Sequence, residues 1–244
     1  MTGGLPTSGS GPVIPNFGGA SHCVRTNGGF CWNWFTSHWG NTFEPALVQH
    51  IELTLIAVAI GFAIAFVLAL AAHRARWLVP PVTFVTSLLY TIPSLAAFEI
   101  LVPLTGINRV TVEIALVSYT LLVLFTNTLA GLSGVSAEVR DAAAGIGLTP
   151  RQTLLRVELP LALPTIFAGL RVATVTIISL ATVAAYILPQ GLGKVIFDAL
   201  HNGDFNTKFI AAGVLAIILA LVADALLAGA QRLLTPWAAA RRSR

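Results

Sequence analysis

Residues 133–162 read SGVSAEVRDAAAGIGLTPRQTLLRVELPLA and lie between two long apolar runs. Residues 137–144 are rich in alanine, and Gly145 and Gly147 follow them. Alanine is the strongest helix former, whereas glycine readily ends a helix. We therefore predict a first short helix over 137–144 that stops at these two glycines.

A second short helix is predicted after the glycines. Thr149 can cap it, Pro150 suits its first turn, and Gln152 follows closely. Pro160 and Pro164 then bracket the return of the chain to the apolar region. The stretch is typical of a helix-turn-helix knob held against one face of a membrane.

Apolar windows dominate the rest of the chain. Of its 244 residues, 56% are hydrophobic and only 10% are charged, whereas a soluble domain carries roughly a quarter charged residues. Crossing a bilayer takes about 20 apolar residues at about 1.5 Å each. Five such windows are present, at 53–72, 81–104, 112–132, 163–188 and 209–230. We predict an all-α polytopic membrane protein with five transmembrane helices.

The distribution of Lys and Arg predicts the orientation, because short cytoplasmic loops retain positive charge. An external N-terminus gives nine basic residues inside and four outside: Arg74, Arg76, Arg140, Arg151, Arg156, Arg232, Arg241, Arg242 and Arg244, against Arg25, Arg109, Lys194 and Lys208. We therefore expect an extracytoplasmic arm (1–45), a transmembrane domain (46–232) with a cytosolic loop (133–162), and a basic cytosolic tail (233–244). This bias explains the net charge of +4 without a nucleic-acid partner.

The arm lacks the basic start and apolar run of a signal peptide. Its cysteines, Cys23 and Cys31, would lie outside the cell, where a disulfide can persist. Two interpretations remain: the cysteines form a disulfide, or they are free thiols. His22 and His38 are near them in sequence, but the spacing matches no compact zinc-ligand pattern. We expect no metal site.

The loop resembles the signature of the inner-membrane components of binding-protein-dependent ABC importers. That signature is Glu-Ala-Ala, three residues, Gly, nine residues, Ile, any residue, Leu-Pro. The matching residues, at the same spacings, are Asp141, Ala142, Ala143, Gly147, Val157, Leu159 and Pro160. Asp replaces Glu and Val replaces Ile, and both changes are conservative.

The resemblance implies a type I importer permease with a MetI-like fold in a bacterial cell membrane. In that family the loop docks into a groove on a separate ATPase, so the seven matching residues are implied to couple ATP to transport. The implied partners are cytosolic ATPases, a second permease chain, identical or a sibling, and an extracytoplasmic substrate-binding protein. ATP and Mg²⁺ would bind the ATPase, and this chain would hold no cofactor and catalyse no reaction.

Three further segments are similar to osmoprotectant-uptake permeases: HIELTL at 50–55, TIPSLA at 91–96 and GLGKVIFDAL at 191–200, with LLTPW at 233–237 also fitting. They imply glycine betaine, choline or carnitine as substrate. Another small solute such as ergothioneine is an alternative, and an ion-driven secondary transporter with Glu99, Arg171 and Asp224 as relay groups is a rival of another class.

Pro93 interrupts the second predicted span and frees a carbonyl, with Thr91 and Ser94 beside it. Two interpretations are open: the break lines the translocation pathway, or the proline only kinks the helix for packing. Glu99 lies deeper and is a candidate for attracting a cationic substrate, although a hydrogen bond to a neighbouring helix explains it equally well.

Other ionisable residues lie within or at the ends of the spans, where charges are costly and indicate function or pairing. Arg171 and Asp224 are at matching depths in the fourth and fifth windows, which predicts a structural ion pair. Glu52 and Glu113 fall near the outer ends. In the outer loop 190–207, the candidate contacts for a binding protein are Lys194, Asp198 and Asp204.

Overall fold

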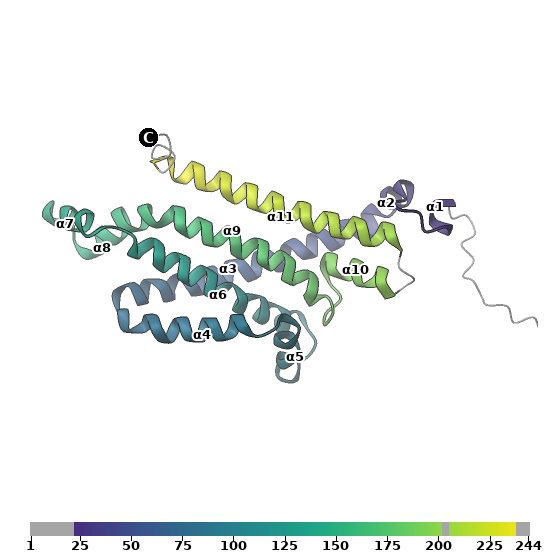
Figure 1. Cartoon of the computed structure of the whole chain (residues 1–244), viewed down its shortest axis with the longest axis horizontal. Helices are drawn as coiled ribbons and strands as arrows, with labels where there is room; N and C mark the ends of the chain where they lie inside the picture. The colour runs from purple at the N-terminus through teal and green to yellow at the C-terminus, as the bar shows by residue number, and fades with distance from the viewer. Residues whose placement is uncertain (1–21, 202–204, 238–244) are drawn as a thin grey trace, which may run out of the picture.

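The computed structural model describes residues 22–201 and 205–237, and every regular element in these ranges is a helix. Four long helices run side by side along the long axis of the molecule (Figure 1). They are α3 (Glu44–Arg74), α6 (Arg109–Ser133), α9 (Leu159–Ala184) and α11 (Asn206–Leu234). All four are long and apolar enough to cross a membrane, which confirms an all-α protein with several membrane-spanning helices.

Apart from the helices within residues 76–105, the shorter elements lie at the two ends of this bundle (Figure 1). At the loop end are α7 (Ala137–Gly145) and α8 (Pro150–Thr153). At the arm end are α1 (His22–Arg25), α2 (Trp32–Ser37), the π-helical turn η1 (Trp39–Phe43) and α10 (Gly191–His201). Residues 22–43 are called the arm below.

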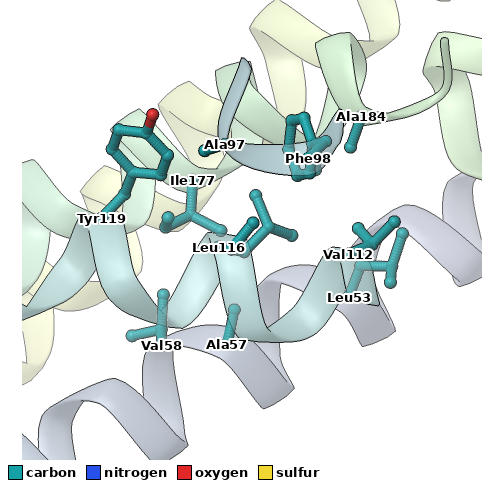
Figure 2. Packing of buried hydrophobic residues seen from close by; sticks show 12 residues of the cluster. Leu53, Ala57, Val58, Ala97, Phe98, Val112, Leu116, Tyr119, Ile177 and Ala184 are labelled. Atoms are coloured by element: carbon teal, nitrogen blue, oxygen red, sulfur yellow. The ribbon is translucent and has the colours of Figure 1, made fainter. Parts of the chain in front are cut away.

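The core lies between α3, α6 and α9, with α6 in the middle. Figure 2 shows Leu53 of α3 beside Val112 of α6, and Ile177 of α9 beside Leu116 of α6, within one buried cluster. Lipid tails are as apolar as leucine, so close packing holds such helices together. At Gly61 the helices are so close that an added Cβ would overlap the Thr120 side chain. α11 packs along α9 at the edge and buries few residues.

The second predicted span, 81–104, is not one helix. α4 (Val79–Thr91) follows the short 3₁₀ turn η2 (Arg76–Leu78), and α5 (Ser94–Thr105) is bent from α4 by 98°. Proline lacks an N–H and pushes the residue before it into extended backbone, and Ile92 indeed has φ −65° and ψ 129°. The fifth span is therefore present only as a broken pair of helices.

The helices extend beyond the predicted apolar windows and loop segments. α3 begins at Glu44 and α11 ends at Leu234, both beyond their apolar windows, because helices continue past the hydrocarbon layer. The second loop helix does not end: α8 continues through a π-helical segment, η3 (Leu154–Glu158), directly into α9. The segment 190–207, predicted as an outer loop, contains α10, which an apolar window does not reveal because α10 is short and amphipathic.

Candidate functional site

The turn after α7 forms as the sequence predicts. Gly147 has φ +85°, a left-handed conformation that glycine adopts without strain. Its N–H donates to the Ala144 carbonyl (2.9 Å), and the Leu148 N–H donates to the Ala143 carbonyl (3.1 Å). These two bonds make a Schellman motif, which satisfies carbonyls at the end of the helix.

A capping box starts the next helix. The Gln152 N–H donates to Thr149 Oγ1 (3.4 Å), and the Thr149 N–H donates to Gln152 Oε1 (2.9 Å). Because the helix then runs without a break through η3 into α9, the loop is joined rigidly to a membrane span. A force on the loop would therefore move α9.

The signature residues fall into two groups. Asp141, Ala142 and Gly147 are exposed at the tip of the loop, while Ala143 is buried beneath them. The second group is half-buried at the base of the loop and comprises Val157, Leu159 and Pro160. Ile146, at 79% exposed, is an apolar side chain at the tip that sequence reasoning missed, although its place between two glycines marks it.

A buried polar contact joins this base to the first span. His73 Nε2 in the last turn of α3 lies 2.9 Å from Glu158 Oε2 in η3, and Glu158 is 6% exposed. They line a cavity of about 540 Å³ together with Arg74 and Arg140. Sequence reasoning missed this contact because the signature leaves the position of Glu158 variable. Glu138, at the start of α7, belongs to a separate contact. A hydrogen bond from the Ser136 side chain, together with one from the backbone, lowers the pKa of Glu138. Its carboxylate is therefore ionised at neutral pH.

The candidate pathway residues share the bend between α4 and α5. Thr91 and Pro93 are exposed, Ser94 is half-buried and Glu99 is exposed on α5. The Thr91 hydroxyl donates to the Ser87 carbonyl of its own helix (2.6 Å). Across the core, the Tyr119 hydroxyl donates to the Ile92 carbonyl at the bend, so α6 satisfies an acceptor that the break frees.

Arg171 and Asp224 meet in a bidentate ion pair between α9 and α11. Arg171 Nε is 2.6 Å from Asp224 Oδ1, and Arg171 Nη2 is 2.7 Å from Asp224 Oδ2. Their side chains are 36% and 35% exposed. The predicted pair is thus present, and it lies at the surface of the chain between α9 and α11.

At the arm end, long-range contacts hold the arm against α10 and α11. Cys23 and Cys31 form a disulfide, and the Cys31 N–H donates to Thr207 Oγ1 in the first turn of α11 (2.8 Å). The Asn206 N–H donates to Asn27 Oδ1 (3.0 Å). Lys208 reaches Asp198 of α10 at 3.5 Å, and Lys194 is exposed. Asp204, residues 1–21 of the arm region and residues 238–244 of the tail lie outside the described residues.

His50 connects three helices at this end. It is fully buried, its Nδ1 accepts a hydrogen bond from the Leu192 N–H of α10 (3.3 Å), and its Nε2 lies 3.0 Å from the Ile178 carbonyl of α9. Because Nδ1 accepts, Nε2 carries the proton. Gly191, with φ +64°, lies so close that a Cβ would come 2.9 Å from His50 Nδ1. Two of the segments that resemble osmoprotectant permeases are therefore in direct contact.

Residues 57–238 match the family described as the inner membrane component of binding-protein-dependent transport systems. The chain belongs to this family. It is a multi-pass membrane protein, and its family consists of transport permeases, which are not themselves enzymes. The match begins inside α3, so the arm lies outside it.

Individual relatives agree with this assignment. The choline transport system permease protein OpuBB of Bacillus subtilis is 37% identical over 77% of this chain and 86% of its own length. The glycine betaine/carnitine/choline transport system permease protein OpuCB of the same organism is 35% identical over the same shares. In structure, the inward-facing MetNI methionine ABC transporter aligns with a TM-score of 0.71 at 17% identity, over 78% of this chain and 94% of that one, which shows a shared fold.

Proposed function

We propose that this permease imports a small quaternary-ammonium compound, such as glycine betaine, choline or carnitine, and that a separate ATPase drives it through residues 133–162. The observation that carries the proposal is the rigid path from the exposed signature at Asp141–Gly147, through the capping box and η3, into α9. A docking surface at one end of such a path converts motion of a partner into tilting of a span.

The proposed assembly has two permease chains, two cytosolic ATPases and a binding protein. Five spans are too few to enclose a pathway, and α11 leaves most of its surface uncovered. ATP and Mg²⁺ belong to the ATPase, and the loop end is cytosolic. The binding protein then meets the arm end, where Lys194 is the exposed cation of α10.

Transport in this scheme is alternating access. Closure of the ATPase dimer draws the two loops together, and each loop moves its α9. His73 and Glu158 carry the same motion to α3, because they join the loop base to that helix. The bend at Pro93 is the proposed lining of the pathway, since α4 and α5 expose Thr91 and Glu99 there.

The substrate class rests on the named relatives. Ergothioneine, which also carries a quaternary ammonium, belongs to the same chemical class. An ion-driven secondary transporter is less well supported, because Asp224 already binds Arg171 through both carboxylate oxygens and is not free to relay protons.

The test is uptake of radiolabelled glycine betaine, choline, carnitine and ergothioneine into proteoliposomes that hold the chain with its partner subunits, with and without internal ATP. We expect ATP-dependent uptake of at least one compound. Uptake that needs no ATP and follows an ion gradient would show that the proposal is wrong, and ATP-dependent uptake of none of the four would overturn the substrate class alone.

Two glycines of the loop provide a matched pair for the coupling role. An added Cβ would meet no neighbour within 4 Å at Gly145 or at Gly147, but only Gly147 has a positive φ. Forcing alanine into that backbone costs about 1–3 kcal/mol. We expect Gly147→Ala to lower ATP-dependent uptake about fivefold or more and Gly147→Trp to abolish it, while Gly145→Ala leaves uptake unchanged. Equal effects of the two alanine variants would contradict the coupling role of the turn.

A further inference from the structure

An apolar groove of about 620 Å³ runs along the outer faces of α3 and α6. The residues that line it recur every three or four positions, which places them on one stripe of each helix. The α3 wall is Ile56, Ile60 and Ile64, and the α6 wall is Val110, Ile114, Val117 and Leu121. The three isoleucines are 39–46% exposed, so the groove is open at the surface of the chain.

The length of the groove matches one leaflet of a bilayer. At about 1.5 Å per residue, the α3 wall is about 12 Å long and the α6 wall about 16 Å long. A bilayer has a hydrocarbon core of about 30 Å, so each leaflet contributes about half of that. One acyl chain lying along the groove would fill it from the arm end to the middle of the membrane.

A cluster of charged groups lies at the arm end of the groove. Arg109, the first residue of α6, donates from Nη1 to Glu52 Oε2 on α3 (3.2 Å). Its Nε is 3.7 Å from Glu113 Oε1, which is too far for a hydrogen bond. Both Glu113 oxygens are buried and, within the described residues, accept no hydrogen bond. With both acids ionised, the cluster carries one net negative charge and an unsatisfied carboxylate.

We propose that this groove binds a phospholipid whose headgroup carries an ammonium. One acyl chain lies between the isoleucines and α6, and the ammonium binds at the charged cluster of Glu52, Arg109 and Glu113. The ammonium would lie against Glu52, whose side chain is 52% exposed, and would bring positive charge near the buried carboxylate of Glu113, which is costly without it. An anionic headgroup would instead meet net negative charge. The site lies in the leaflet of the arm end and does not depend on the transported substrate.

A second copy of this chain suits the groove less well. Arg171 is the one basic residue within the five apolar windows, and it already binds Asp224 through two hydrogen bonds. A span from a second copy would therefore cover the apolar walls without bringing a free cation to Glu113.

The test is competition between phosphatidylethanolamine and phosphatidylglycerol of identical acyl chains, with retained lipid measured by native mass spectrometry of the purified permease complex. We expect retention of phosphatidylethanolamine to exceed that of phosphatidylglycerol about fivefold, the effect of one charge near a membrane surface. Glu113→Gln should remove this preference, and Ile60→Trp should displace both lipids by filling the groove.

Two variants control for general effects. Glu44→Gln removes an exposed acid at the same end of α3, and Leu221→Trp adds bulk on the exposed face of α11, so neither should alter retention. Equal retention of the two lipids by the wild type would overturn the proposal, as would a preference unchanged in both Glu113→Gln and Ile60→Trp. Disulfide formation between two Ile60→Cys chains would also overturn it, because a second copy would then occupy the groove.

Discussion

The two ends of the bundle are built by different means. At the loop end, neighbours in sequence make the structure: Gly147 closes α7, and Thr149 and Gln152 cap α8 within three residues of each other. At the arm end, residues far apart in sequence are tied together, as when Cys31 binds Thr207 across 176 positions. Local motifs leave the loop exposed for a partner, whereas long-range ties fix the arm against α10 and α11.

Removal of the disulfide should give the largest effect and should be confined to the arm end. A disulfide stabilises by about 2–4 kcal/mol, chiefly by restricting the unfolded chain. Cys23→Ser combined with Cys31→Ser should therefore speed hydrogen exchange of amides in 22–43 at least about 30-fold, since 1.4 kcal/mol is a factor of ten. Exchange over 137–153 should be unchanged, and this range is the internal control. Acceleration at both ends would show that the two regions are not independent.

The contact between His73 and Glu158 joins residues far apart in sequence at the loop end. It therefore tests how far the difference between a locally built loop end and a long-range arm end holds. Removal of one partner from a buried hydrogen bond costs about 1–3 kcal/mol. Glu158→Ala should lower the thermal unfolding midpoint of the detergent-solubilised complex and raise the ATP hydrolysed per substrate imported, because α3 is no longer joined to the loop base.

Glu158→Gln keeps an acceptor for His73 and is the matched variant. We expect it to restore most of the unfolding midpoint. If Glu158→Ala lowers the midpoint but leaves the ratio of ATP to substrate at the wild-type value, the contact is structural and does not carry motion to α3.

The same contrast explains what could be predicted from the sequence. Apolar windows locate the long helices because, in a chain with so little charge, a run of about 20 apolar residues indicates a transmembrane helix. The glycine turn and the Thr149 cap are local, so residue types and spacing predict them. The kink at Pro93 is local too, but the sequence reveals neither its angle of 98° nor the packing of α5 against α6 and α9.

What sequence reasoning missed depends on distant partners. His50 stands at the edge of an apolar window with no sign that it meets Leu192 and Ile178. Glu113 resembles any acid near a membrane boundary, yet its oxygens are buried at the end of a groove. Such positions acquire a role only when two helices meet, and one sequence does not state which helices those are.

The smallest predicted effect is at the cap of α8. Replacement of an N-cap threonine by alanine costs about 1 kcal/mol. In the structure the Gln152 N–H donates a hydrogen bond to the Thr149 hydroxyl, so Thr149→Ala should speed hydrogen exchange of the Gln152 amide about fivefold. Thr149→Ser keeps the hydroxyl and should exchange as the wild type does. Because the cap is local, exchange of the Cys31 and Asn206 amides at the arm end should not change. A change there would mean that α9 transmits even a loosened cap along its whole length, and the contrast between the two ends would then describe how each is built but not how each moves.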